Sequence, residues 1–567
     1  MSTTDGLDDF LTKVGTGKWN YLFIATSFTY SGALPVFLIG NEFLNAVTSY
    51  SCDIPNNNRT RPMNGSQCEM IEEDSNGYEK IMPCEKWIYD TSVFHSTVTM
   101  DWNLVCERAW LSPLFQTIYS VGCFLGVILA AITSDRYGRR WSIRAGSVFT
   151  AGFTIVLLIS PWLWLIMLAR FLLGIFNAIL NGNAFMISME VCSPSMRPIV
   201  GILYSLPYAL MVIGLSGLAY WIREWRLLQA VTSWPCLLLL VLVCFIDESP
   251  RWLIVKGHLE EAVQILQRAV RLNQPKFPQD LDVSALVYSI RQRQNERTSR
   301  LSQKDSAPGN THDSFSSTGT NKMSLNKPDN YLDLDDGIGP WWAGPVALVR
   351  TKIMAKVTLG LSGMVLLQGV VYLGLPLSSR SFKSPFLYIA LLGALEIPLC
   401  ILAGPVTRRF GRKPILGTCL TSCGILLILT AALLLADIKD ERVIMTLILT
   451  GFLFVATAYA VNILYAPELF PTTLRPWGTA AFVLSNYAGF SISPIIVDYA
   501  EDLLWVPPAV MGACSIVSGS LLFLLPETNG RSLPETIADL HRAREEERNL
   551  KLSIYKKESR SPYYQLD

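Results

Sequence analysis

The chain has 567 residues, with 47 Lys and Arg against 46 Asp and Glu, a formal net charge of +1, and 50% hydrophobic residues. The hydrophobic residues are concentrated in long runs that carry almost no charge, and the charged residues lie between these runs. This distribution excludes a soluble protein of three or four domains. No acidic or basic tail large enough to suggest a nucleic-acid partner is present. The composition therefore indicates a membrane protein.

Twelve stretches are long and apolar enough to cross a bilayer as helices, which takes about 20 residues for roughly 30 Å of hydrocarbon. They are 19–43, 111–133, 143–160, 164–189, 199–221, 227–246, 355–376, 385–404, 415–435, 443–464, 477–498 and 506–525. The first run is too long for the core of a signal peptide, so we expect it to remain as an uncleaved anchor. The predicted fold class is an all-α membrane protein of twelve transmembrane helices in two six-helix halves.

Lys and Arg in the short loops predict which end of each span lies in the cytoplasm. Basic clusters follow the second span (Arg136, Arg139, Arg140, Arg144) and the eighth span (Arg408, Arg409, Arg412, Lys413). With both clusters cytoplasmic, the two termini are cytoplasmic as well. The expected regions are a cytoplasmic N-terminus 1–18, an N-terminal half 19–246 with an extracellular loop 44–110, a cytoplasmic central loop 247–352, a C-terminal half 353–525 and a cytoplasmic tail 526–567.

The loop 44–110 has the composition of an extracellular segment. It is acidic and contains two N-glycosylation sequons, at Asn58 and Asn64. It also contains four cysteines, which in an oxidising compartment predict two disulfides with three possible pairings. These cysteines are Cys52, Cys68, Cys84 and Cys106. The expected location is the cell membrane.

Three further segments lie outside the spans. Residues 258–273 have apolar residues on one helical stripe and predict an amphipathic surface helix. Residues 291–330 are rich in polar residues and predict a disordered linker. In the tail, residues 537–550 predict a charged helix, and the rest of the tail is expected to be solvated.

Several kinds of chemistry are missing from the sequence. Residues 15–18 (GTGK) lack the spacing of a nucleotide-binding loop, so we expect no nucleotide partner. All four histidines lie outside the spans, and no motif of a hydrolase or metalloenzyme stands in a plausible setting. We therefore expect a carrier without cofactor or metal, rather than an enzyme. Six spans on each side of a long loop are typical of two repeated halves that move about a site at the middle of the membrane.

A short motif supports this repeat. Residues 136–140 (RYGRR) and 409–413 (RFGRK) share the pattern Arg-x-Gly-Arg-basic, after the second and the eighth span. The positive-inside rule explains the basic residues but not a glycine at the same spacing twice.

These motifs resemble the signature of the major facilitator superfamily. More narrowly, the chain resembles the organic cation, anion and carnitine transporter family, and most closely its organic cation branch. The resemblance is carried, in order, by residues 101–106 (DWNLVC), 202–231, 248–253 (ESPRWL), 468–475 (ELFPTTLR), 526–530 (PETNG) and 533–536 (LPET). It extends over nearly the whole chain and implies a transporter of small organic ions.

The resemblance also implies a set of gating residues. In the family, an Asp and its arginines tie the two halves together on the cytoplasmic side while the site faces outward. On this chain the network would comprise Asp135, Arg136, Arg139, Arg170, Glu190, Glu248, Arg251, Arg409, Arg412, Glu468 and Arg475, with Glu527 from the tail. The alternative is that these residues are ordinary charged groups at helix ends.

The candidate substrate site centres on Glu396 in the eighth span, because charge inside a membrane is costly and is a functional hypothesis by default. The family also has a carboxylate close to the substrate at this position. A lone carboxylate would attract an organic cation; alternatively it would pair with an internal arginine. Aromatic faces also attract ammonium groups. The expected neighbours are Gln368, Tyr372, Tyr204, Tyr208, Phe28, Tyr30 and Tyr487. Each aromatic residue has core or lipid packing as its alternative role.

Departures from the family pattern leave the substrate open. Cation carriers often have an Asp, and anion or carnitine carriers an Arg, where this chain has Tyr487. Ala178 stands where the cation branch has a lysine, and Ala131 stands where the first motif has a glycine. In the second motif, Arg408 stands where an Asp is expected. Relatives commonly have six cysteines in the outer loop, where this chain has four. The first hypothesis is a potential-driven, polyspecific transporter of small organic cations. The alternatives are a transporter of organic anions or of zwitterions such as carnitine, and a non-transporting receptor with the same fold.

Overall fold

A computed structural model describes residues 5–53, 60–62, 67–73, 79–274, 282–305, 343–471, 474–498 and 503–529. Within these residues, twelve helical segments are long and apolar enough to span a membrane, which confirms the prediction. The first six are built on α2 (Lys18–Leu38), α5 (Leu111–Tyr137), α6 (Arg139–Ile159), α7 (Leu163–Val191), α9 (Leu206–Trp221) and α11 (Trp234–Phe245). The last six are α16 (Lys352–Leu377), α17 (Pro385–Phe410), α18 (Arg412–Leu435), α19 (Glu441–Glu468), α20 (Arg475–Asp498) and α21 (Val506–Leu521).

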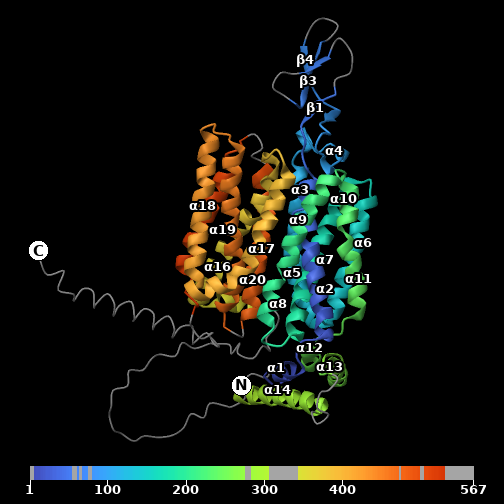
Figure 1. The fold of residues 1–567 in the computed structure, drawn as a ribbon, viewed down its shortest axis with the longest axis vertical. Helices are drawn as coiled ribbons and strands as arrows, with labels where there is room; N and C mark the ends of the chain where they lie inside the picture. Colours follow the sequence, from blue (N-terminus) through green and yellow to red (C-terminus); the bar gives the residue numbers. More distant parts are fainter. Residues whose placement is uncertain are drawn as a thin grey trace, which may run out of the picture.

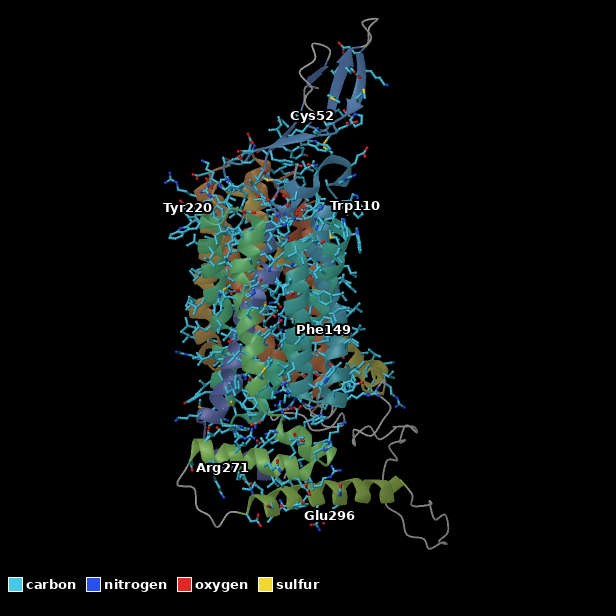
Figure 2. The ribbon with its side chains drawn as sticks, turned by 90° about the vertical axis from the view of Figure 1, so that its right-hand side faces the viewer. Cys52, Trp110, Phe149, Tyr220, Arg271 and Glu296 are labelled. Atoms are coloured by element: carbon cyan, nitrogen blue, oxygen red, sulfur yellow. A yellow bond between two sulfur atoms is a disulfide. The ribbon has the colours of Figure 1, made fainter. Side chains whose placement is uncertain are left out.

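The spans form two six-helix halves that stand side by side (Figure 1). The halves contact each other chiefly through α5 against α20 and α9 against α17. The outward faces are apolar: Phe149, halfway along α6, points away from the bundle (Figure 2), and Ile159 and Phe523 are largely exposed. Because such a belt is unfavourable in water, it indicates a surface that faces lipid.

Short strands project from one end of the bundle, which we call the strand end (Figure 1). The strands are β1 (Tyr50–Cys52), β2 (Thr60–Pro62), β3 (Glu69–Glu73), β4 (Glu79–Pro83) and β5 (Trp87–Tyr89). β1 pairs with β5, and β2, β3 and β4 form a separate antiparallel sheet. Disulfides join Cys52 to Cys84 and Cys68 to Cys106, which confirms two disulfides and selects one of the three pairings. Asn58 and Asn64 lie outside the described residues.

Short helices lie at the opposite end, which we call the helix-layer end (Figure 1). They are α1 (Asp5–Val14), α12 (Pro250–Lys256), α13 (Leu259–Asn273) and α14 (Val283–Asp305). α13 confirms the amphipathic helix expected over 258–273. Its apolar stripe packs with those of α1 and α14 in one buried cluster, which includes Phe10, Leu266 and Val287.

The remaining short elements extend or connect the spans. α3 (Asn41–Leu44), α8 (Arg197–Leu203) and α10 (Trp225–Thr232) adjoin α2, α9 and α11, and α15 (Ala343–Arg350) precedes α16. α4 (Val98–Trp102) and the 3-10 turn Cys106–Arg108 precede α5, the 3-10 turn η3 (Ser378–Ser381) follows α16, and the turn Leu522–Leu524 follows α21.

The disordered linker predicted over 291–330 is wrong in its first part, because α14 continues to Asp305. The cause is tertiary: Val283, Val287 and Ile290 bury the start of α14 against the neighbouring helices, and a helix nucleated in this way can continue into a polar segment. Residues 306–330, and the charged helix predicted over 537–550, lie outside the described residues.

Candidate functional site

Glu396 lies near the middle of α17, in an otherwise apolar stretch, and is partly buried by the protein. Its Oε1 accepts a hydrogen bond of 2.5 Å from the hydroxyl of Tyr372 on α16. No Lys or Arg in the described part of the chain forms an ion pair with it. The arrangement therefore holds one carboxylate in place by a neutral donor and leaves its charge uncompensated.

Aromatic rings surround this carboxylate on its own half of the molecule. The ring of Tyr372 stacks on Tyr459 from α19, with 4.7 Å between centroids. Phe452 and Phe490 stack on the same ring at 5.7 and 6.2 Å. The sequence interpretation missed these three partners, because hydropathy does not tell which aromatic residues of a span point inward.

The other half contributes Tyr204 and Tyr208, close to the junction of α8 and α9. Tyr208 interacts electrostatically with both Glu396 and Tyr372, so it lies across the interface from them. The hydroxyl of Tyr204 donates a 2.5 Å hydrogen bond to Asn181 on α7. The structure thus brings Tyr208 close to Glu396 and Tyr372 across the interface, whereas Tyr204 forms its hydrogen bond within its own half and faces Tyr459 of the other.

Three other expected site residues are enclosed in this conformation. Tyr30 is 1% exposed, and its hydroxyl donates a hydrogen bond to the carbonyl oxygen of Asn177 at 2.7 Å. Gln368, also 1% exposed, accepts a hydrogen bond from Asn462. Tyr487 is buried with its ring edge-on to Phe490.

At the helix-layer end, the first basic motif forms a compact joint within the N-terminal half. Gly138 has φ +96° and ψ 164°, a conformation that is essentially restricted to glycine. It turns the chain from α5 into α6, and the Glu248 carboxylate accepts hydrogen bonds from the first backbone N–H groups of α6, 2.9 Å from that of Arg139. The Arg139 guanidinium reaches Glu190 at 3.3 Å and Asp135 at 3.8 Å.

The second basic motif repeats this joint in the C-terminal half. Gly411 has φ +87° and ψ 166°, and the Glu527 carboxylate accepts hydrogen bonds from the backbone N–H groups of Arg412 and Lys413 at 3.2 and 2.9 Å. The Arg412 guanidinium reaches Glu468 at 3.0 Å. The glycine in the repeated motif therefore serves a backbone turn that seats a carboxylate on a helix N-terminus.

Other candidate gating residues lie around these joints. Arg251 forms an ion pair with Asp8 of α1, and Arg475 donates a 3.1 Å hydrogen bond from Nε to the carbonyl oxygen of Pro467. Arg136 and Arg409 are exposed and lie over the rings of the next residues along the chain. Among the described residues, every ion pair at this end joins two residues of the same half.

The placement of Arg170 at the cytoplasmic face is wrong. It lies twenty residues before Glu190 on the same helix, α7, which corresponds to about 30 Å along the helix axis. It is fully buried, and its Nη2 donates a 2.7 Å hydrogen bond to Gln116 on α5. The rings of Phe115 and Tyr119 lie 4.4 and 4.9 Å from its guanidinium carbon. The predicted topology already argues against that placement, because the fourth span, 164–189, begins on the side opposite the basic loop that follows the second span.

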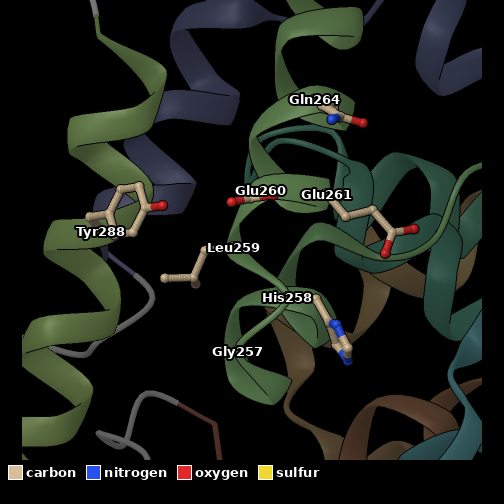
Figure 3. A pocket seen from close by; sticks show the side chains of 7 residues that line it. All are labelled: Gly257, His258, Leu259, Glu260, Glu261, Gln264 and Tyr288. Carbon is tan, nitrogen blue, oxygen red and sulfur yellow. The ribbon is translucent and has the colours of Figure 1, made fainter.

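A surface pocket lies apart from the spans, where α13 begins beside α14 (Figure 3). Tyr288 of α14 and Leu259 of α13 point toward each other there, and His258, Glu260, Glu261 and Gln264 complete the lining together with Gly257. It contains none of the expected substrate-site residues. The candidate substrate site remains the carboxylate and the rings between the halves.

The chain matches the family described as sugar (and other) transporter, over residues 65–309 and 361–539. It is 29% identical to solute carrier family 22 member 20 of Mus musculus, covering 80% of this chain and 74% of that protein. It is 28% identical to a beta-alanine transporter of Drosophila melanogaster, covering 81% and 69%. It is 26% identical to organic cation/carnitine transporter 4 of Arabidopsis thaliana, covering 81% and 79%.

The fold is similar to that of solved transporters. An inward-open structure of the xylose transporter XylE from E. coli superposes with a TM-score of 0.58 at 15% identity, covering 91% of this chain and 97% of that one. A structure of the peptide transporter POT superposes with a TM-score of 0.53 at 12% identity, covering 91% and 99%. Both comparisons confirm the predicted arrangement of two six-helix halves.

Proposed function

Because the chain belongs to the sugar (and other) transporter family, we propose that it carries small organic cations across the plasma membrane by alternating access. The protein is a membrane transporter rather than an enzyme, and its relatives carry small organic substrates. No coupling reaction is needed, since a monovalent cation gains about 2.3 kcal/mol per 100 mV of inside-negative potential. That energy corresponds to roughly fifty-fold accumulation at equilibrium.

The observation that carries the choice of a cation is the uncompensated charge of Glu396. Its described partner is the neutral hydroxyl of Tyr372, so an ammonium group would supply the missing opposite charge. The surrounding rings favour the same ligand, because each aromatic face attracts a cation by about 0.5–2 kcal/mol. Tyr372 and Tyr459 present stacked rings beside the carboxylate, and Tyr208 approaches it from the other half.

For the direction of transport, we place the strand end outside the cell. The two disulfides of the strand projection support this orientation, since disulfides persist in oxidising compartments. The basic joints around Arg139 and Arg412 then lie in the cytoplasm, in agreement with the positive-inside rule. Labelling an epitope tag at either terminus in intact and permeabilised cells tests this: a terminus that is stained without permeabilisation would contradict the orientation.

The test of function is uptake of a labelled quaternary ammonium compound by cells that express the protein, with the membrane potential set by external potassium. We expect saturable uptake that follows the potential and persists without sodium. Glu396→Gln keeps the size and the hydrogen bond but removes the charge, so we expect the KM for the cation to rise roughly tenfold or more. Glu441→Gln, which alters a partly exposed carboxylate paired with Lys383, is the matched control.

A second candidate is the transport of organic anions or zwitterions. The observation that favours it is the fully buried Arg170, whose Nε and Nη1 have no hydrogen-bond partner among the described residues and which forms no ion pair there. The similarity to a beta-alanine transporter supports it as well. Two results together would favour this candidate over the first. The protein would take up a zwitterion but not the quaternary ammonium compound, and Glu396→Gln, shown to be at the cell surface, would take up the zwitterion as the wild-type protein does.

A further inference from the structure

The strand end contains buried polar contacts between the two halves that none of the motifs predicted. Glu42 on α3 is 2% exposed, and its Oε2 accepts a 2.7 Å hydrogen bond from the hydroxyl of Ser379. Ser379 lies in η3, directly after α16, and is 1% exposed. A carboxylate of one half is thus bound by a hydroxyl of the other, in a position closed to solvent.

Arg380, the next residue, strengthens this junction. Its Nη1 lies 3.0 Å from Oδ1 of Asp498, at the end of α20 in the same half. Its Nη2 donates a 3.3 Å hydrogen bond to the carbonyl oxygen of Asn45 in the other half. Asn45 is itself fully buried and held by Ser112 and Thr99. The guanidinium therefore connects a carboxylate of its own half with a rigid backbone position across the interface.

Apolar rings close around the same place. Phe386, at the start of α17, stacks on Phe43 with 5.6 Å between centroids. Phe94 and Tyr220 contact the same ring at 5.5 and 5.7 Å. Phe386 belongs to the C-terminal half and the other three belong to the N-terminal half. Glu42 and Ser379 are almost fully buried, so the polar contacts beside these rings operate at low dielectric constant.

Among the described residues, the charges at this junction do not balance. Two carboxylates, Glu42 and Asp498, face one guanidinium, that of Arg380. From α17, the phenol of Tyr388 also faces Glu42. Nearby, Lys383 is largely exposed and pairs with Glu441, while Arg226 of α10 pairs with Asp101. Closing the junction with both carboxylates ionised leaves one buried negative charge uncompensated, which is costly.

The two ends of the molecule differ in this respect. At the strand end, hydrogen bonds cross the interface from Ser379 and Arg380, and also from Thr117 to Ser491 and from Ser216 to Phe386. At the helix-layer end, the ion pairs of the described residues stay within one half. The halves are therefore fastened to each other at the strand end in this conformation.

We propose that Glu42, Ser379, Arg380 and Asp498 form a gate that closes the strand end, and that binding of one proton by the gate favours the closed state. The inference rests on the alternating-access function proposed above. With both carboxylates ionised, closure buries one negative charge without a partner, and one bound proton removes that charge. Low pH on the strand side therefore favours closure, and high pH favours opening.

The proton enters and leaves from the strand side, because the carboxylates of the gate meet water on that side when the gate opens. The gate thus makes the rate of transport sensitive to external pH without moving protons across the membrane. A collapse of the proton gradient at constant external pH should leave uptake unchanged.

The test measures the separation of the halves directly rather than transport. Fluorophores are introduced into the full chain at two exposed strand-end positions, Trp221 in the N-terminal half and Leu435 in the C-terminal half, and energy transfer is measured in lipid nanodiscs. Between about pH 8 and about pH 5.5 we expect a shift toward the short distance, with the closed-to-open ratio changing by up to about tenfold per pH unit. Glu42→Gln should give the short distance at both pH values.

The control is Glu441→Gln, which removes the charge of a partly exposed carboxylate at the same end and should keep the pH dependence of the wild-type protein. A wild-type distance that ignores pH, or an unchanged pH dependence in Glu42→Gln, would overturn the proton-binding gate. Ser379→Ala provides a second variant that keeps every charge and should lengthen the distance at each pH; no change would overturn the role of this contact. A normal gate response without any cation uptake would contradict the proposed substrate but not the gate.

Discussion

The two halves present the same joint at the helix-layer end, but the N-terminal one is more tightly enclosed. In both, a glycine turn seats a glutamate on the next backbone N–H groups, at distances down to 2.9 Å. Glu248 is 7% exposed, whereas Glu527 is half-buried. The reason is α12: its Trp252 donates a 3.2 Å hydrogen bond to the carbonyl oxygen of Asp135 and covers the N-terminal joint. The two motifs therefore form the same joint, but only the glutamate of the N-terminal joint is almost fully buried.

A second difference concerns an arginine on each half. Arg197 and Arg475 each donate a hydrogen bond from Nε to a carbonyl oxygen eight residues earlier, at 3.0 and 3.1 Å. Arg197 also forms a 2.6 Å ion pair with Asp8 of α1, which Arg251 shares. Arg475 forms no ion pair among the described residues. The N-terminal half is therefore clamped by a helix that has no counterpart in the described part of the C-terminal half.

The largest difference between the halves should follow from replacing the two glycines. A Cβ at Gly138 would lie 2.3 Å from Oε2 of Glu248, and one at Gly411 would lie 3.3 Å from Oε2 of Glu527. Both replacements incur a backbone cost of about 1–3 kcal/mol, but Gly138→Ala also displaces the glutamate. We expect a clearly larger drop in thermal stability for Gly138→Ala, measured on the purified protein. Equal drops would show that the enclosure of Glu248 has no energetic consequence.

A smaller effect should follow from breaking the clamp on α1. Asp8→Asn removes the charge shared by Arg197 and Arg251, and partly buried ion pairs of this kind contribute about 1 kcal/mol. We expect several-fold faster amide hydrogen exchange across residues 5–14, with little change in the spans. Asp9→Asn, at the exposed neighbouring position, should leave exchange as in the wild-type protein. Similar exchange in both variants would argue against the clamp.

The smallest effect concerns pH. Burial raises the pKa of Glu248, although the backbone N–H groups of Ser249, Arg140 and Arg139 oppose this. Between the ordinary pKa and the raised one, the folded protein binds more protons at this site than the unfolded chain, so stability falls as pH rises through that window. Glu248→Gln should flatten this slope in thermal unfolding measured across the window. A slope that is steeper in the variant than in the wild-type protein would contradict the sign.

The parts of the fold that sequence predicted well are those set by local composition. The spans follow from runs of apolar residues, α13 follows from its stripe, and the two disulfides follow from an even set of cysteines. The repeated glycine indicated equivalent joints because a positive φ is a local requirement of the turn. In each case the signal lies within a short stretch of chain.

The parts that sequence did not predict depend on partners far away in the chain. Arg380 contacts Asn45, 335 positions away, and no motif indicates that contact. Tyr459 joins the site only because α19 packs beside α16. α1 and the length of α14 were missed for the same reason, since α1 and the start of α14 are buried against each other and against α13.

Arg170 has a consequence for how the protein is made. It is the eighth of the 29 residues of α7, and a charged side chain within a spanning helix is costly to insert into the bilayer. Its guanidinium contacts Gln116 and the rings of Phe115 and Tyr119 on α5, and it donates a 3.4 Å hydrogen bond to the carbonyl oxygen of Phe37 on α2, which also precedes α7. Because α5 precedes α7 along the chain, ribosomal synthesis delivers these groups to the membrane first. The order of translation thus ensures that α7 emerges next to a helix already able to receive its charge.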